Sequence, residues 1–231
     1  MSRVPVSMKR IWMIGAIAAA LLLLGTGIAQ AGVIASSPDS NTYAGGPFHQ
    51  AAGEISSYAN PAGSLAPHNV VAVDRGPDGE QLFASGTINP GGSAPLPGTQ
   101  YLAPGTYDFV CTLHDGMADE LIVSGGTPAA RPEIGVTIPR QKLKKVRKSG
   151  TLAVDVEGVN DATGVSLEVS KGAKTLGTVS DVSVPTGTTR TVSVKLTRAG
   201  KKAIKTGKKA AVVAEGSLAF GKSVTAKRTL R

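Results

Sequence analysis

The chain has 231 residues, a formal net charge of +9, 4% aromatic residues, three histidines and one cysteine, Cys111. This length allows one large domain or two of ordinary size, and a single cysteine excludes an internal disulfide framework. Three histidines are too few for the several copper ions of a multicopper oxidase.

The first 31 residues have the pattern of a secretory signal peptide. A basic start precedes an apolar run over residues 11–28, and an Ala-Gln-Ala sequence ends at residue 31 with the spacing of a signal peptidase site. We expect cleavage before Gly32. An uncleaved anchor is the alternative, because 18 apolar residues just span a bilayer. In both cases the remaining chain is exported, to a periplasm or to the cell envelope and exterior.

Charge divides the exported part into two halves. Residues 32–130 hold one basic and nine acidic residues, whereas residues 131–231 hold 21 basic and seven acidic ones. Such asymmetry favours two domains with different partners. A stretch of small, Pro- and Gly-containing sequence joins them. We predict domains over residues 32–126 and 134–231, with a linker over residues 127–133.

The first half predicts an all-β sandwich. After an extended lead-in, short apolar and β-branched runs alternate with turns, and no helical periodicity of any length is present. In the strand over residues 106–111, Tyr107, Phe109 and Cys111 share one face. The expected strands cover residues 33–36, 55–60, 67–74, 81–88, 106–111 and 120–123.

The second half predicts an immunoglobulin-like β-sandwich with a short helix over residues 197–208. Alternating apolar and polar residues mark its strands, and Lys171-Gly172 fits a hairpin turn. The expected strands cover residues 134–138, 151–157, 165–170, 175–180, 190–196, 210–215 and 224–230.

A candidate metal site lies in residues 105–123, GTYDFVCTLHDGMADELIV. Cys111, His114 and Met117 follow one another at intervals of three, which combines thiolate, imidazole and thioether donors in one turn. This soft donor set suits copper far better than magnesium or calcium. A mononuclear copper site also needs a second imidazole. His68, 43 residues before the cysteine at the start of a strand, can provide it.

Two stretches carry a family resemblance. Residues 60–70 (NPAGSLAPHNV) and 105–117 (GTYDFVCTLHDGM) resemble the cupredoxins, or blue copper proteins, and look most like the amicyanin and plastocyanin-like group. Residues 53–60 (GEISSYAN) resemble the strand that precedes them in this family, but Ser56 stands where an apolar residue is usual. This departure predicts weaker core packing around Ser56.

The resemblance implies a cupredoxin-like Greek-key sandwich that binds one copper ion, cycling between Cu(I) and Cu(II). His68, Cys111 and His114 would be the equatorial ligands and Met117 the axial one. Asn69 and Thr112 would fix the ligand geometry by a hydrogen bond. The electron-transfer surface would consist of His114, Leu113 and Pro67.

The ligand set predicts an electron carrier and not an enzyme, because no ligand position is left open for a substrate. Two histidines and one cysteine can also hold zinc, but Met117 is then idle and no carboxylate is evidently placed as a base. A Cys111–His114 nucleophile pair lacks an oxyanion hole. His49 has no neighbour at ligand spacing.

The remaining alternative is a binding or copper-storing protein whose copper domain is a scaffold. The basic residues 134–231 fit a tether to an anionic cell-wall or membrane surface. Nucleic acid fits poorly, because Phe220 is the one aromatic residue of this half and stacking platforms are missing. The acidic first half predicts a redox partner with a basic docking face.

Overall fold

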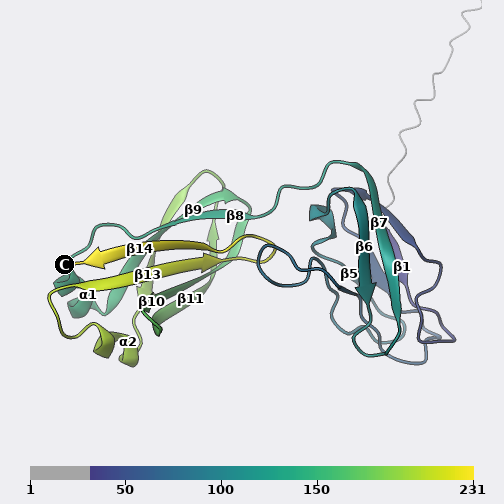
Figure 1. Ribbon diagram of the computed structural model, residues 1–231, viewed down its shortest axis with the longest axis horizontal. Coiled ribbons are helices and arrows are strands. Elements are labelled where there is room, and N and C mark those ends of the chain that lie inside the picture. The colour runs from purple at the N-terminus through teal and green to yellow at the C-terminus, as the bar shows by residue number, and fades with distance from the viewer. Residues whose placement is uncertain (1–31) are drawn as a thin grey trace, which may run out of the picture.

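The computed structural model describes residues 32–231 and folds them almost entirely into strands (Figure 1). The expected signal peptide falls on residues 1–31 and therefore lies outside the described residues. Between residues 32 and 231, no helix has the length and apolar character needed to cross a membrane.

Seven strands form two sheets in the first unit. One sheet has the order β1-β3-β5 and the other β2-β7-β6-β4. β2 pairs in parallel with β7, so an early strand lies beside the last strand of this unit. The elements are β1 (Val33–Ala35), β2 (Phe48–Ala52), β3 (Ser57–Ala59), β4 (Val71–Ala72), β5 (Ser93–Pro95), a 3₁₀ turn η1 (Thr99–Tyr101), β6 (Gly105–Val110) and β7 (Ala118–Gly126).

An aromatic cluster centred on Phe109 fills the space between these sheets. Phe109 is fully buried in β6, and its ring centroid lies 4.8 Å from that of Tyr43, 6.0 Å from Phe48 and 6.3 Å from Phe83. The tilted and edge-on arrangements suit aromatic rings, whose edges and faces carry opposite partial charge. This cluster supports the end of β6 from which Cys111 follows.

The second unit is also a seven-stranded, two-sheet sandwich, with a separate hydrophobic core. Its sheets have the orders β12-β9-β8 and β11-β10-β13-β14. The elements are β8 (Glu133–Thr137), α1 (Leu143–Ser149), β9 (Thr151–Asn160), β10 (Ala162–Lys171), β11 (Lys174–Val184), β12 (Thr189–Lys195), α2 (Arg198–Ala203), β13 (Ala210–Ser217) and β14 (Val224–Leu230).

These two sandwiches confirm the all-β prediction. In the second one, β11 pairs with β10, whereas the constant-type immunoglobulin order places the corresponding fourth strand on the other sheet. The expected Lys171-Gly172 hairpin is present, because Lys171 pairs with Lys174. The expected short helix is α2, and its N-cap Thr197 accepts a hydrogen bond from the Gly200 N–H.

Three expectations about secondary structure were wrong. The lead-in contains β2, which was expected to be irregular. α1 was not expected, because its sequence LKKVRKS reads as a block of charge; its Leu143 and Val146 are nevertheless buried at helical spacing. Residues 81–88 form isolated bridges through Gln81, Ala84 and Ile88 instead of a continuous strand.

Ser56 is buried in a hydrogen-bonded network, so the expectation of weak packing around it was wrong. Its hydroxyl donates to Gln50 Oε1, and its backbone N–H donates to Thr99 Oγ1 (2.9 Å). Gln50 Nε2 in turn donates to the Thr99 carbonyl (2.9 Å). A buried polar group costs little when its partners are present. These contacts join β2 to the start of β3 and to η1.

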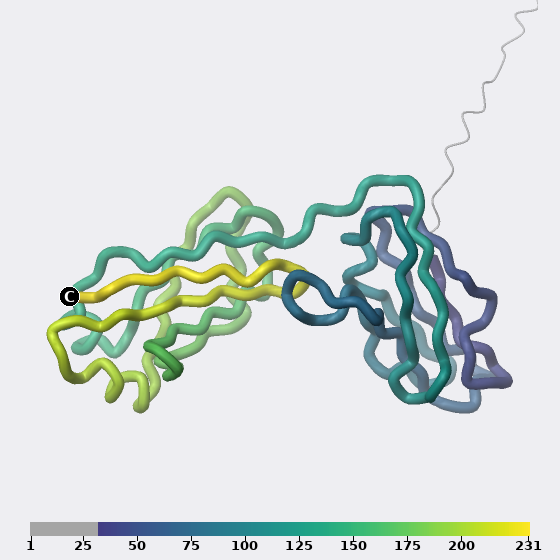
Figure 2. Tube along the Cα trace, in the orientation of Figure 1, coloured from purple at the N-terminus to yellow at the C-terminus, as the bar shows by residue number. Residues whose placement is uncertain are grey.

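The two units touch where the β13–β14 turn meets the first unit (Figure 2). The Phe220 ring packs on Tyr101 with centroids 5.5 Å apart, and the Phe220 N–H donates to Asp78 Oδ2 (2.6 Å). Arg131 donates to the Phe220 carbonyl (3.3 Å) and lies 5.5 Å from the Tyr101 ring centroid. Gly98 leaves room for this ring, because a Cβ there would lie 2.8 Å from Phe220 Cε1.

Candidate metal centre

The turn between β6 and β7 presents Cys111 and His114 together. The Cys111 N–H donates to the Met117 carbonyl (2.9 Å), and the Met117 N–H donates to the His114 carbonyl (3.4 Å). Gly116 adopts a left-handed conformation with φ of 76° that an L side chain rarely takes, which lets the chain turn back tightly. The turn is therefore closed by backbone bonds that do not depend on a bound ion.

His68 reaches the same place from a different segment. It forms an antiparallel bridge with Ile88, in which each residue donates its N–H to the carbonyl of the other (3.1 and 2.8 Å). Its side chain is fully buried. The backbone pairing with Ile88 therefore fixes the position of His68 independently of the contacts of its ring.

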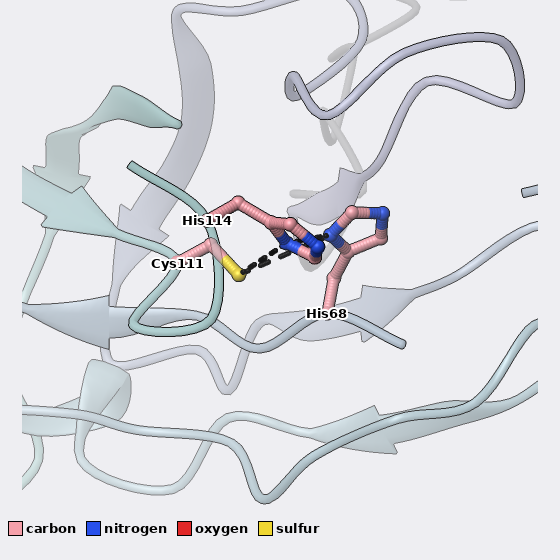
Figure 3. A group of neighbouring side chains, drawn as sticks. All are labelled: His68, Cys111 and His114. Carbon is pink, nitrogen blue, oxygen red and sulfur yellow. Dashed lines mark hydrogen bonds between the residues drawn. The ribbon is translucent and has the colours of Figure 1, made fainter. Parts of the chain in front are cut away.

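The side chains of His68, Cys111 and His114 converge (Figure 3). The two Nδ1 atoms are 3.1 Å apart, and Cys111 Sγ lies 3.9 Å from His68 Nδ1 and 3.6 Å from His114 Nδ1. A point equidistant from the three atoms lies about 2.1 Å from each, which compares with metal–nitrogen bonds of about 2.0–2.1 Å and metal–sulfur bonds of about 2.3 Å at zinc. The three donors thus fit around one metal ion.

Electrostatics favour the form of His68 that binds metals. Burial, assisted by the neighbouring His114, lowers the pKa of His68, so its ring is neutral at pH 7 and has a free lone pair. The facing Nδ1 atoms can share only one proton, whereas a cation at the centre accepts a lone pair from each. His68 Nε2 is buried and has no hydrogen-bond partner within the described residues, whereas Nδ1 is the ring atom that faces His114 and Cys111.

Met117, the expected axial ligand, lies at the end of the same turn. Its side chain is 1% exposed, and its backbone closes the turn on Cys111. The Met117 side chain is therefore buried, and it lies close in sequence to Cys111 and His114. Its thioether is the other soft donor group in this turn.

Asn69 and Thr112 are joined by hydrogen bonds, as the family resemblance implied. Asn69 Nδ2 donates to Thr112 Oγ1, and the Thr112 N–H donates to Asn69 Oδ1, both at 2.8 Å. Since these residues follow His68 and Cys111 directly, the pair holds the two donor-bearing segments together.

Tyr43 is a supporting residue that the sequence did not reveal. Its buried hydroxyl donates to the Asn69 carbonyl (2.6 Å), and its ring packs edge-on against Phe109. Burial is the main cause of the raised pKa of Tyr43, so the phenol stays protonated and remains a donor. An isolated tyrosine in a Gly- and Ser-rich lead-in has no local pattern that marks it.

The expected electron-transfer surface is partly open to solvent. His114 is half-buried, Leu113 is 47% exposed and Pro67 is exposed. Leu65, close to Pro67 in sequence, is 76% exposed. His49 is exposed on β2 and does not belong to the donor group. Of the three donors, His114 is thus the one with access to solvent.

Some solved structures are similar to part of the chain. No protein-family model matches the chain, and no curated protein matches it. Solved structures that are similar to it include a reduced amicyanin variant (26% identity, TM-score 0.33, 41% of this chain and 82% of that one) and a dithionite-reduced auracyanin from Roseiflexus castenholzii (25%, 0.32, 40% and 94%). Another is a purple cupredoxin from Nitrosopumilus maritimus (20%, 0.31, 41% and 100%). Because their TM-scores lie below 0.5, these likenesses do not bear on the function of the chain.

The donor group itself limits the chemistry. Among residues 32–231 it consists of two histidines and one cysteine, with no carboxylate in the group. Hydrolysis at a metal uses a bound water and a base to accept its proton. A soft nitrogen and sulfur set, with a thioether close in sequence, instead suits copper.

Proposed function

We propose that this chain is an exported type 1 copper protein that carries single electrons between redox partners. The observation that carries the proposal is the donor triangle of His68, Cys111 and His114, whose centre lies about 2.1 Å from all three atoms. Two imidazoles and a thiolate with a weak thioether are the ligand set of electron-transfer copper sites. Met117 would provide the thioether.

A copper ion in this site would supply a one-electron couple between Cu(I) and Cu(II). The chain keeps the donor positions nearly constant. His68 is fixed by its bridge to Ile88, and the Cys111 turn is closed by its own backbone bonds. Asn69 bonds to Thr112 across the two segments. Donors that do not move between oxidation states favour fast electron transfer.

His114 is the proposed exit for the electron. It is the partly exposed donor, and exposed Leu113 and Pro67 offer apolar surface beside it in sequence. Small apolar patches of this kind suit short-lived redox encounters. The excess of acidic residues in 32–130 would attract a partner with a basic docking face.

The second unit is proposed to tether the protein to an anionic surface. Residues 134–231 hold most of the basic residues of the exported chain, and Phe220, their one aromatic residue, is used in the contact with Tyr101. The proposed location is the periplasm or the exterior of the cell envelope. This location rests on the signal-like sequence of residues 1–31.

The experiment is copper loading of a chain that comprises residues 32–231. We expect intense visible absorption from the copper–thiolate bond after addition of Cu(II), its loss in Cys111→Ser, and no change in the control His49→Gln. Reversible one-electron reduction of the coloured protein would support a carrier, whereas tight binding without reversible reduction would indicate storage. A colourless protein, or colour that survives Cys111→Ser, would exclude the proposed centre.

A further inference from the structure

Positive charge gathers at the end of the second unit that lies away from the first unit. Residues 140–148 and 198–209 hold twelve of the 21 basic residues of 131–231 and no Asp or Glu. The first segment contains α1 and the second contains α2, and Figure 1 places both helices at the far end, next to the end of β14. We refer to these two segments and Arg228 as the basic cap.

Backbone and side-chain contacts bring the segments of the cap together. Arg147 donates to the carbonyls of Ile204 (2.6 Å), Thr206 (3.0 Å) and Gly207 (2.7 Å), which ties α1 to the chain after α2. Lys201 of α2 packs over Gly150 at the end of α1, since a Cβ on that glycine would lie 2.7 Å from Lys201 Cε. The cap is therefore one ordered surface built from two distant segments.

The helices turn their basic residues outward. In α1, Leu143 and Val146 face the core, whereas Lys144, Lys145 and Lys148 are exposed. The cap side chain with the most hydrogen bonds, Arg147, contacts carbonyl oxygens, which carry no formal charge. Its positive charge therefore remains available to attract an anion.

Two hollows give the cap a concave shape. One of about 630 Å³ is lined by Arg140, Lys142 and Arg228 with their neighbours, close to the start of α1. Another of about 420 Å³ is lined by Arg147, Lys201, Lys202 and Lys205, close to the end of α1. Lys142 lines the first hollow and Arg147 lines the second, and five residues of helical rise, about 7.5 Å, separate them along α1. This spacing suits a ligand that carries several negative charges in a row.

The side chains of the cap argue against membrane insertion and base stacking. None of the six large hydrophobic side chains that are exposed between residues 32 and 231 belongs to the cap: Val33, Ile55, Leu65, Val73, Leu113 and Val159. Proteins that insert into a bilayer surface use such residues. Phe220 packs on Tyr101 at the other end of this unit, so the cap has no aromatic platform for nucleic-acid bases.

We infer that the basic cap binds a linear polyanion with phosphate groups along its chain. Guanidinium groups bind phosphate through two parallel hydrogen bonds, and lysines add charge along the strand. A strand that follows the two hollows contacts Arg140 and Arg228 in one. In the other it contacts Lys201, Lys202 and Lys205 beside Arg147, whose Nε and Nη2 already donate to carbonyls. The inference deepens the tether of the proposed function, and it leaves the metal centre, on the other unit, free to meet a redox partner.

The test is binding of long-chain inorganic polyphosphate to the metal-free chain of residues 32–231, followed by titration calorimetry at about 50 mM and about 500 mM salt. We expect binding at low salt that is strongly weakened at high salt. Arg140→Gln with Arg228→Gln should weaken it about tenfold or more. Arg190→Gln with Lys222→Gln removes the same charge from exposed sites outside the cap and should change it less than about twofold.

Several outcomes would overturn the inference. One is that polyphosphate does not bind at low salt. Another is that the two double variants weaken binding equally. The third is that inorganic phosphate binds with the same affinity as the polymer. Vesicles of phosphatidylglycerol that bind as tightly and depend on the same two arginines would assign the cap to a bilayer instead. Because the chain is metal-free in this experiment, its result is independent of whether copper gives the expected colour. Thermal unfolding of both double variants verifies that they are folded.

Discussion

Asn69 and Thr112 exchange two hydrogen bonds of 2.8 Å, one between their side chains and one from the Thr112 backbone to the Asn69 side chain. Asn69 follows His68 and Thr112 follows Cys111. The hydrogen bonds therefore join two residues that are 43 positions apart in the chain. The pair thus holds the two donor-bearing segments together. The first prediction tests this role.

Replacing Asn69 with Ala should loosen the metal centre. The change leaves Thr112 Oγ1 and the Thr112 N–H without their partner, and because Thr112 is exposed, the loss of the two bonds should lower the free energy of unfolding by about 0.5–1.5 kcal/mol. Copper affinity should fall about 10–100-fold, as for other residues that orient ligands. Urea unfolding and competition with a copper chelator measure the two effects. The exposed Asn41→Ala is the control, and equal behaviour of the two variants would contradict the proposed role.

Met117→Leu should separate packing from ligation. The two side chains are similar in volume, so the metal-free protein should lose less than about 1.5 kcal/mol of stability. If the thioether is the axial ligand, the reduction potential and visible spectrum of the copper form should shift. Leu121→Met is the control, because it makes the reverse exchange at another fully buried position. An unchanged potential in Met117→Leu would remove this residue from the ligand set.

Ser56→Ala should destabilise the first unit although it makes the core more apolar. The variant leaves Gln50 Oε1 without the Ser56 hydroxyl as donor, at a cost of about 1–3 kcal/mol. Calorimetric unfolding measures the change. The neighbouring Ser57→Ala, at a partly exposed position, should have an effect of less than about 0.5 kcal/mol. A stabilised Ser56→Ala would show that the network is dispensable.

Phe220→Ala should loosen the contact between the two units. An aromatic pair such as Phe220 and Tyr101 contributes about 0.5–1.5 kcal/mol, so the separated population should rise about 2–10-fold. Small-angle scattering should show a larger radius of gyration, and proteolysis should accelerate at residues 127–133. The exposed Val159→Ala serves as control. Identical scattering and cleavage in both variants would mean that this contact does not hold the units together.

The donor residues could be predicted from the sequence because their spacing is local or their type is rare. Cys111, the one cysteine, lies three residues before His114, and His68 stands at the start of an expected strand. The pairing of Asn69 with Thr112 came from the family resemblance. Alternating strands such as β13 and β14 were also predictable, because one buried face repeats every second residue.

Features that depend on distant partners could not be predicted. In the sequence, Ser56 is a polar residue at an apolar position of a strand. Its hydrogen-bond partners, Gln50 and Thr99, are evident only in the folded structure. Tyr43 supports Asn69 across 26 residues without any local pattern. α1 could not be recognised in the sequence because five of the residues from 142 to 148 are basic. Its inner face has only two buried positions, Leu143 and Val146.

The docking of Phe220 on the first unit has an electrical consequence. It holds a unit with a formal charge of −8 at one end of an elongated molecule and a unit with +14 at the other. The protein is therefore a permanent macroscopic dipole. Near an anionic boundary such a molecule experiences a torque as well as an attraction, and it arrives with its cationic pole forward.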